Sequence, residues 1–485
     1  MKSISRLAIA SAIFSCIGTA GIAQVSNSLY FMHGVPQSNR INPAFQPKCG
    51  FYLGFPAAAP LRMEISSSSL SYSNIIFPHP TQDSLITFMY SEAYKQAFLN
   101  ALKPVNFVSN NLGTSLASLG FRTGAGFFSL DVTTRVDGSF YYPGDIFRFM
   151  LYGAGEGETY TFDGIGTDLA VLNEISLGWS AGILDNLHVG ARAKMLFGIA
   201  NFSTTRSALD LYTSQDEWII RSDMMFNASL PFSEIIYDED GFVEDILLNE
   251  ELENPDPFDI PGYIFNAGNL GFGVDVGASY RPIEQLQLSA SVLDLAFIRW
   301  NDGVNDVSFN TEYSFKGLEI NPFEFSEEYT FGDYLDSTLT QMGDSLLQFL
   351  QFTPGRAYSK RLNTKLYLGA SFYVTPGINF GLLSRTDFLP QRIAQQVTAS
   401  ANFTTGRFIN LTLSYSYMNS YLKNIGAGLA FNVGPLNLYL ISDNALNLVF
   451  WPYEARSANL WFGMNLVFGY KQFKHPEFRD RPLVY

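Results

Sequence analysis

The chain has 485 residues and a formal net charge of −15, from 30 Lys and Arg against 45 Asp and Glu. Only 15% of its residues are charged and another 15% are aromatic, whereas soluble domains carry about 25% charged residues. This composition excludes an ordinary secreted globular protein, and the excess of acids disfavours a nucleic-acid partner. After the first 23 residues no apolar run approaches the ~20 residues of a spanning helix, which excludes a helical membrane protein.

Residues 1–23 have the features of a signal peptide. Lys2 and Arg6 precede an apolar stretch that ends near Ile17, and small residues lead to Ala23. This pattern predicts export, and the alternative of a membrane anchor is disfavoured because the apolar stretch is short. A lipoprotein signal is a weaker alternative, because bulky Phe14 stands close before the cysteine at position 16. Cleavage after residue 23 leaves Cys49 as the single cysteine, so no intramolecular disulfide is expected.

Residues 24–49 are predicted to form a hatch, or plug. This segment is rich in Asn, Ser and Pro and does not alternate in polarity, yet it contains Leu29, Tyr30, Phe31 and Met32. A disordered periplasmic leader is the alternative. The apolar and aromatic content favours a segment that packs against the rest of the protein.

Residues 50–470 show the alternation of a β-barrel. In "NLTLSYSYMN", residues 410–419, Leu and Tyr occupy one set of alternate positions, or parity, and Thr and Ser occupy the other. Similar dyads recur in residues 175–181, 187–197, 270–280, 286–292, 397–403 and 460–468. A soluble β-sandwich would pack the apolar parity on its core, whereas a membrane barrel turns that parity towards lipid. Export and the low charge content together favour the all-β transmembrane antiparallel barrel.

The number of strand-like segments is fourteen to sixteen, and an even count is expected. A ring of that size is too wide to be filled by wall side chains, so a plug is needed or the lumen becomes a pore. The polar parity carries the predicted lumen-wall residues His188, Arg192, Lys194 and Asp275. Short turns of one rim are predicted at residues 375–377, 405–407, 419–423 and 434–435.

Two regions interrupt the strand pattern. Residues 210–261 accumulate acidic side chains and are predicted to form a long extracellular loop. Its "YDEDGFVED" does not have EF-hand spacing, so no metal site is expected, although loose cation bridging to lipopolysaccharide is an alternative. Residues 331–352 have apolar positions at helical spacing and predict an amphipathic loop helix. A shorter helix is predicted over residues 91–102, and packing within a loop subdomain is preferred to partner binding for both.

No catalytic residues and no cofactor are predicted, and the chain is not expected to be an enzyme. Gly343-Asp344-Ser345-Leu346 matches a hydrolase signature but lacks the α/β context that this signature needs. Only four histidines are present, without an HExxH pattern, a cysteine pair or a Gly-x-Ser-x-Gly elbow. The sequence therefore offers no nucleophile with a base and an orienting group.

The phrase "RINPAFQP" contains Asn42-Pro43-Ala44 and resembles the start of the hatch in FadL-type outer-membrane proteins and in the PorV-like barrels of Bacteroidota. The mature chain also resembles a Bacteroidota outer-membrane family of unknown function. The matching stretches are "LYFMHGVPQSNRINPAFQP", "LASLGFRTGAGFFSLDVTTR", "LGFGVDVGASYRP", "SVLDLAFIRW", "LYLISDNALN" and "FGMNLVFG". The resemblance implies a FadL-like barrel of about fourteen strands in the outer membrane of a Gram-negative bacterium. It implies no activity.

Two functions are compatible with these features. In the first, a hatch that includes Arg40, Asn42, Pro43 and Ala44 gates passive transport of small hydrophobic molecules, and Arg40 and Asn42 anchor it by hydrogen bonds to the wall. In the second, the barrel is a structural or docking subunit that accompanies secretion or assembly machinery. A transporter should have a continuous apolar pocket beside the hatch, whereas a docking barrel should be occluded and expose an apolar patch. The expected surroundings are outer-membrane lipid and lipopolysaccharide, with residues 471–485 as a periplasmic tail.

Overall fold

The computed structural model describes residues 27–55, 61–153, 155, 157–237, 243–248, 262, 264–315, 349–389, 392–405, 408–418, 421–450 and 455–469. The predicted signal peptide and the C-terminal tail lie outside these residues. Among the described residues, none of the helices is both long and apolar enough to cross a membrane.

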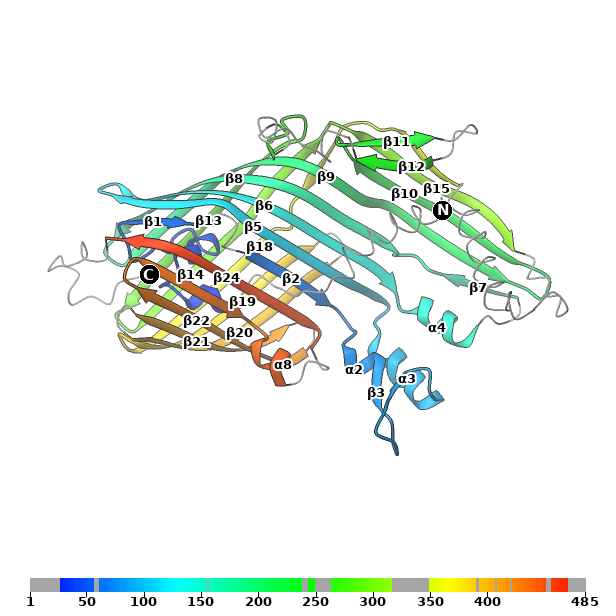
Figure 1. Ribbon diagram of the computed structural model, residues 1–485, viewed down its shortest axis with the longest axis horizontal. Helices are drawn as coiled ribbons and strands as arrows, with labels where there is room; N and C mark the ends of the chain where they lie inside the picture. The colour runs from blue at the N-terminus through cyan, green and yellow to red at the C-terminus, as the bar shows by residue number, and fades with distance from the viewer. Residues whose placement is uncertain are drawn as a thin grey trace.

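Fourteen antiparallel strand positions form a closed ring (Figure 1). One position is shared by β1 (Phe51–Gly54) and β2 (Leu61–Ser67), which both pair with β5 on one side and β24 on the other. The other thirteen are β5 (Val105–Thr123), β6 (Gly126–Pro143), β8 (Gly166–Leu184), β9 (Leu187–Thr213), β13 (Leu270–Ile283), β14 (Leu286–Trp300), β18 (Lys365–Thr375), β19 (Ile378–Leu389), β20 (Arg392–Thr405), β21 (Ile409–Met418), β22 (Tyr421–Val433), β23 (Leu436–Ser442) and β24 (Ser457–Phe468). The predicted barrel and its strand number are confirmed.

The two rims of the barrel differ in their connections. At the rim where β1 begins and β24 ends, hairpins join β5 to β6, β8 to β9, β13 to β14, β18 to β19, β20 to β21 and β22 to β23. All the long connections lie at the opposite rim, as expected for the extracellular side of an outer-membrane barrel. The predicted turns at 375–377, 405–407 and 434–435 fall on the hairpin rim. The turn predicted at 419–423 is misplaced, because β21 ends at Met418 and β22 begins at Tyr421 on the opposite rim.

The apolar parity of the strands faces outwards and the polar parity faces the lumen. In β21, Leu413 and Tyr415 are 43% and 49% exposed, whereas Thr412 and Ser414 are 1% and 4% exposed. Outward apolar side chains recur around a ring in which the backbone is paired. Hydrocarbon is the only environment that suits such a continuous apolar outer surface. The direction of the alternation therefore confirms the membrane barrel over the soluble sandwich.

One side of the barrel extends far beyond the other at the extracellular end. The second half of β9 leaves β13 and pairs with β7 (Glu158–Thr161) and β10 (Trp218–Ser229), which leads to β15 (Val304–Phe315) and β16 (Leu350–Pro354). We call this extension the canopy (Figure 1). It carries exposed ion pairs, such as Arg206–Asp223, which places it in water.

The prediction of a loop over residues 210–261 is wrong in its first part. Residues 210–213 belong to β9 and β10 follows, because their pairing continues the sheet beyond the barrel wall. Part of the remainder forms a hairpin of β11 (Ser233–Tyr237) and β12 (Val243–Leu248). Most of the helix predicted over residues 331–352 lies outside the described residues, and its last three residues belong to β16 instead.

A small subdomain leaves the extracellular rim between β2 and β5. It comprises α2 (Tyr72–Ile75), β3 (Ile76–Pro78), β4 (Leu85–Thr87) and α3 (Glu92–Ala101), and α3 confirms the helix predicted over 91–102. It packs on α4 (Asp145–Tyr152), where the rings of Phe98 and Phe147 meet edge to face. Hydrogen bonds from Tyr152 and Gln96 hold the pKa of Glu92 below its ordinary value.

Near β24, α8 (Ala445–Phe450) completes this rim, and β17 (Tyr358–Arg361) pairs with β14.

The outward direction of Leu413 predicts a position-specific cost of charge. Leu413→Arg should lower the stability of the folded barrel by about 2–4 kcal/mol, because its guanidinium would lie in hydrocarbon. The measurement is the midpoint of urea unfolding in lipid vesicles. The folded fraction is read from a denaturing gel, on which the unheated folded barrel migrates differently from the unfolded chain. Leu413→Phe is the matched control and should leave the midpoint nearly unchanged. A large loss with Phe would mean that this side chain packs in a protein core.

Candidate functional site in the barrel lumen

The N-terminal segment lies inside the ring and fills the half of the lumen nearest the hairpin rim (Figure 1). It includes the short helices η1 (Ser28–Phe31) and η2 (Pro36–Arg40) and then leads into β1. Every residue of η1 is buried, and the strands that η1 contacts most closely are the neighbours β20, β21, β22 and β23. We call residues 27–49 the plug.

The first half of the plug packs mainly through apolar contacts. Its members in this core are Leu29, Tyr30, Phe31, Met32 and Val35, and the wall contributes Leu293, Tyr367, Leu383, Ala430, Tyr439, Ile441 and Trp461. The rings of Tyr30 and Tyr367 stack with centroids 5.9 Å apart. Full burial of one large apolar side chain stabilises by about 1.5–3 kcal/mol, so this half is held firmly against the wall.

Asp443 secures the start of the plug, although it follows β23 and is 415 to 416 positions away along the chain. Its carboxylate accepts the backbone N–H groups of Asn27 at 2.5 Å and Ser28 at 2.8 Å, and the Ser28 hydroxyl at 2.5 Å. Asn459 donates a further hydrogen bond at 3.2 Å. The sequence analysis did not assign Asp443 a role. The available signal was its position in the family-like stretch "LYLISDNALN", where an acid falls among otherwise neutral polar residues.

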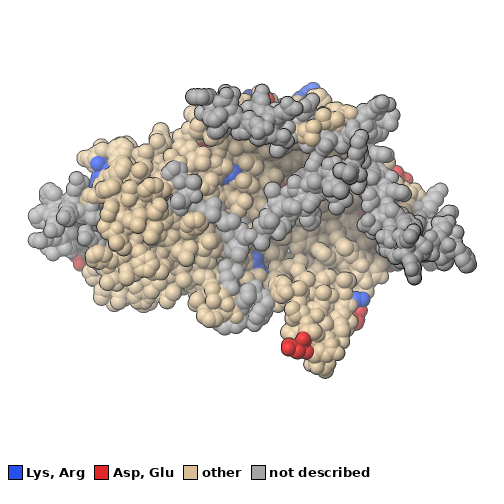
Figure 2. Space-filling model, viewed as in Figure 1, with Lys and Arg blue, Asp and Glu red and all other residues tan. Residues whose placement is uncertain are grey.

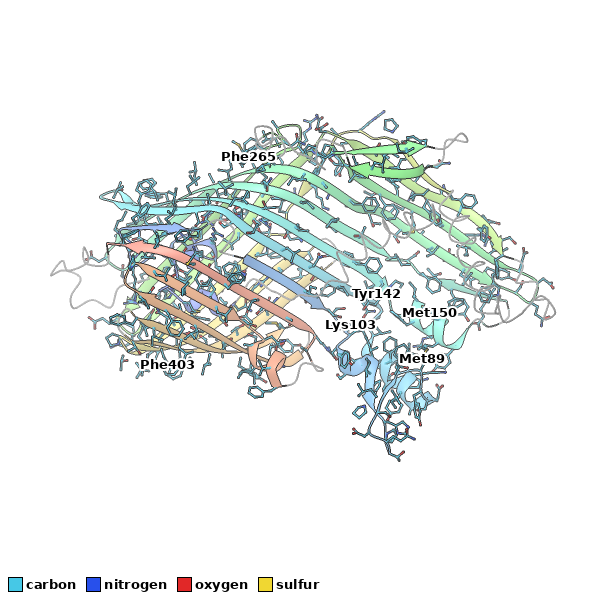
Figure 3. The ribbon with its side chains drawn as sticks, viewed as in Figure 1. Met89, Lys103, Tyr142, Met150, Phe265 and Phe403 are labelled. Atoms are coloured by element: carbon cyan, nitrogen blue, oxygen red, sulfur yellow. The ribbon has the colours of Figure 1, made fainter. Side chains whose placement is uncertain are left out.

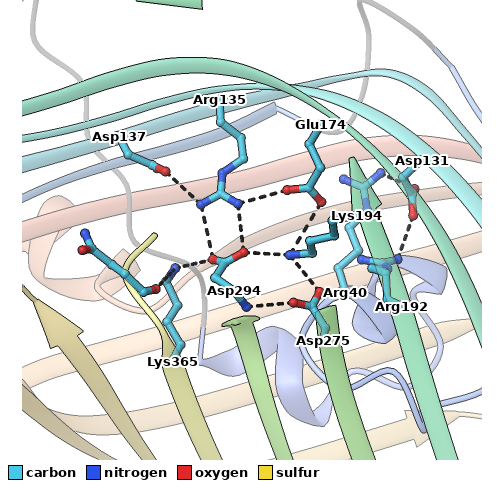
Figure 4. Close-up of polar contacts among 11 residues, drawn as sticks. Arg40, Asp131, Arg135, Asp137, Glu174, Arg192, Lys194, Asp275, Asp294 and Lys365 are labelled. Atoms are coloured by element: carbon cyan, nitrogen blue, oxygen red, sulfur yellow. Dashed lines mark hydrogen bonds and ion pairs between the residues drawn. The ribbon is translucent and has the colours of Figure 1, made fainter. Parts of the chain in front are cut away.

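The second half of the plug is held by polar contacts together with Ile41 and Phe45, which belong to the same apolar core as the first half. Arg40 donates from one Nη atom to Asp131 at 2.6 Å and to Ser115 at 2.8 Å, and Arg192 binds the other oxygen of Asp131 at 2.7 Å (Figure 4). Near the rim, Arg122 donates to the side chain of Gln46 at 2.5 Å and to the Pro47 carbonyl at 3.0 Å.

Asn42, Pro43 and Ala44 lie against the paired strands β9 and β13. The Asn42 amide donates to the carbonyls of Ala278 and Ala290, both at 3.3 Å, and its oxygen accepts the backbone N–H of Ala44 at 3.0 Å. Gly190 and Gly277 are direct partners in the ladder, and any Cβ there would overlap the Pro43 carbonyl or the Asn42 side chain. The motif therefore fits a groove that two glycines leave in the wall.

The four predicted lumen-wall residues all lie on the inward parity, but in two environments. Arg192, Lys194 and Asp275 are buried and paired, Arg192 with Asp131 and Lys194 with Asp275 at 2.8 Å. His188 lies lower on β9, opposite Gly182 and Ser279 near the hairpin rim, and its Nδ1 has no partner among the described residues. The structure brings His188 into neither charged pair.

A cluster of buried ion pairs lies on the extracellular side of the plug, and Asp294 is at its centre (Figure 4). The Asp294 carboxylate binds Lys194 at 2.7 Å, Lys365 at 2.7 Å and Arg135 at 3.0 Å, and Arg135 also binds Glu174 at 3.0 Å. Asp294 has a φ of 57° at a bulge where β14 and β13 change register. Its own backbone N–H donates to Asp275 at 2.8 Å. The bulge thus turns two consecutive residues of β14, Leu293 and Asp294, to the inside.

Two cavities of about 70 Å³ each lie in the lumen at this level. The inner cavity is bounded by the plug residue Arg40 and the charged cluster, and the outer one opens towards the hollow beneath the canopy (Figure 2). Lys365 lines both, so the charged cluster separates them. One wall of the outer cavity is apolar, with Leu172, Ile298, Trp300 and Leu362, and the other is polar, with Arg385, Asp387 and Gln396. The site thus offers both an apolar and a charged surface to one molecule.

Within the described part of the chain, no group of three or more His, Cys, Asp and Glu side chains is arranged to hold a metal ion. The acids of the lumen are instead neutralised by Lys and Arg at ion-pair distance.

A family model described as "Family of unknown function (DUF5723)" matches residues 43–443. No curated protein matches the sequence. Among solved structures, the toluene transporter TbuX of Ralstonia pickettii is 10% identical, covering 93% of this chain and 96% of its own, with a TM-score of 0.37. A FadL homologue of Pseudomonas aeruginosa is 9% identical, covering 92% and 96%, with a TM-score of 0.36. The P. putida toluene transporter TodX is 10% identical, covering 88% and 93%, also at 0.36. At these TM-scores the likeness carries no functional assignment.

The two halves of the plug should loosen independently. Asp443→Ala leaves the buried N–H groups of Asn27 and Ser28 without their acceptor, which costs about 1–3 kcal/mol for each group. Faster amide hydrogen exchange is expected at residues 28–35, with little change at residues 36–47.

Arg40→Ala should give the reverse pattern, because it removes the contact of the second half with Asp131 while Arg192 keeps that carboxylate paired. Amide hydrogen exchange of the folded barrel, measured by mass spectrometry, compares the two variants directly. Asp83→Ala, an exposed position in the rim subdomain, is the control. Uniform loosening of the whole plug by both variants would contradict the division into two halves.

Proposed function

The chain belongs to DUF5723, a family of unknown function, and we propose that it is an outer-membrane barrel for the gated, passive entry of small molecules. The observation that carries the proposal is the order of spaces along the lumen. The outer cavity lies on the extracellular side of the charged cluster, and the inner cavity lies between that cluster and Arg40 in the second half of the plug. A barrel used only as a scaffold has no need of a recess aligned with its plug.

The walls of the outer cavity favour molecules that are part apolar and part polar. Ile298 and Trp300 supply apolar contact from β14, and Arg385 and Gln396 supply polar contact from the facing strands β19 and β20. A pure hydrocarbon would next meet the buried ion pairs of Asp294, where desolvated charges would gain nothing from it. The continuous apolar pocket expected for transport of fully hydrophobic molecules is not formed by the described residues, so we propose amphipathic ligands.

Opening of the lumen requires that the second half of the plug move. Hydrogen bonds of Arg40, Asn42 and Gln46 can exchange for water or for ligand contacts, because their net cost is small when they are replaced. Movement of the first half would cost more, because five of its residues belong to the apolar core, whereas the second half contributes only Ile41 and Phe45. We propose that residues 27–35 remain in place and act as the hinge for residues 36–49.

A docking role is the second candidate, and the firm packing of the plug favours it. A lumen that never opens would serve as a rigid support for partner proteins, with the plug acting as a permanent core. The two roles differ in one measurable property, because only a transporter needs a route that becomes continuous when the plug moves.

Removal of residues 25–47 should raise the ion conductance of single barrels in planar lipid bilayers from nearly closed to that of an open channel. A ring of fourteen strands without the plug is wider than its wall side chains can fill. The band shift on an unheated gel serves as the control for folding. Unchanged conductance of the folded variant would contradict gating by the plug and favour the docking role.

The outer cavity should control passage once the plug is removed. Ala394→Trp in the deletion background should reduce conductance and solute uptake into liposomes, because Ala394 lines the outer cavity. Gln395→Trp is the matched control, because this neighbouring residue is exposed on the outward parity near the rim, where Trp is well tolerated. Equal effects of both substitutions would show that the cavity is not on the route.

A further inference from the structure

Large apolar side chains are exposed along one arc of the extracellular rim. They come from the subdomain between β2 and β5, from α4 and from α8. The group consists of Tyr72, Leu85, Met89, Tyr90, Met150, Tyr152, Val449 and Phe450, which are between 44% and 71% exposed. We call it the rim surface. Figure 3 shows Met89 and Met150 at the same end of the barrel.

The rim surface is not the leftover core of a poorly packed loop. The subdomain has its own core, in which Phe88 stacks on Phe98 with centroids 4.2 Å apart and Phe77 packs on Tyr94 at 4.7 Å. Phe98 is 2% exposed and also contacts Phe147 of α4. The exposed group is therefore presented on a folded support, in addition to a core that is already complete.

Strand register fixes the height of this group relative to the membrane. Ser66 of β2 pairs with Ser457, the first residue of β24, and Ser67 donates its N–H to the Arg456 carbonyl. The subdomain thus begins at the extracellular edge of β24, a strand of 12 residues, which is close to the 9–11 residues that cross the hydrocarbon. α8 occupies the same edge between β23 and β24. The rim surface is therefore level with the outer boundary of the hydrocarbon.

The outward face of the barrel leads up to the rim surface, and exposed charges beside that surface include Asp83, Asp145 and Arg148. Phe140 of β6 is 45% exposed on the lipid-facing parity, three residues before Pro143, the last paired residue of that strand. The subdomain leads into β5 at this edge, and α4 follows β6. Figure 1 shows that the subdomain projects sideways from the barrel, away from the canopy. A sideways projection at this height lies over the lipid that surrounds the barrel.

We infer that the rim surface is a membrane-contact surface that rests in the outer leaflet, with Leu85, Met89 and Val449 among the acyl chains. Tyr72, Tyr90 and Tyr152 lie where their rings meet the apolar layer and their hydroxyls meet the headgroups, the position that Tyr prefers at membrane interfaces. Apolar contact of this kind holds amphipathic segments about 5–10 Å into the boundary region. The contact would fix the tilt of the barrel and so keep the canopy mouth facing away from the membrane.

The test places a fluorophore on the rim surface of the full-length protein. Leu85→Cys is labelled with an environment-sensitive dye and reconstituted in phosphatidylcholine vesicles that carry a spin-label quencher near the headgroup. Cys49 is 1% exposed, so the unsubstituted protein serves as the blank for labelling. Asp216→Cys, in the turn between β9 and β10 at the canopy tip, is the matched control, and Met89→Cys is a second rim position.

The inference predicts that emission at positions 85 and 89 shifts to shorter wavelength and is lost to the quencher, whereas position 216 stays water-exposed and unquenched. Emission at 85 and 89 equal to that at 216 would overturn the inference. Labels that are water-exposed in vesicles but shielded in native outer membranes would also overturn it, because a protein partner would then be the occupant.

Discussion

The structure depends on a single constraint, that every backbone N–H and C=O group within the membrane must be paired inside the chain. Lipid offers no hydrogen bonds, so the sheet must close, and β24 meets β1 and β2 to complete the ring. Closure sets the orientation of all side chains at once. Leucines, phenylalanines and tyrosines contact lipid, and serines, asparagines and charged residues line the lumen.

Ring size then creates the need for a plug and for charge pairing. Fourteen strands enclose more space than wall side chains fill, and residues 27–49 occupy it with an apolar first half and a second half that combines polar contacts with Ile41 and Phe45. Charges that point inwards cannot reach bulk water, so they neutralise one another around Asp131 and Asp294. The contacts that complete the interior are therefore also the contacts that hold the plug to the wall.

The unequal height of the wall gives the barrel its directional character. On one side β9 runs for 27 residues and carries the canopy over the mouth, whereas on the other side β21, β23 and β24 end after 10, 7 and 12 residues. The rim subdomain and α8 begin at the low edge beside β24. α4 joins the subdomain to the canopy, because Phe147 contacts Phe98 and Phe149 contacts Trp218. The proposed entry beneath the canopy and the inferred membrane-contact surface are thus connected through α4.

The sequence by itself determined which residues face lipid, that residues 27–49 pack against the barrel instead of forming a disordered leader, and where hairpins such as Gly434-Pro435 fall. These properties are local, because the two-residue period and turn chemistry depend only on neighbouring residues. Only the tertiary structure decided that Asp443 holds Asn27, that Asp294 gathers Arg135, Lys194 and Lys365, and that residues 210–229 are strand. These contacts join residues far apart in the chain, so they exist only once closure and register have fixed which strands face each other across the lumen.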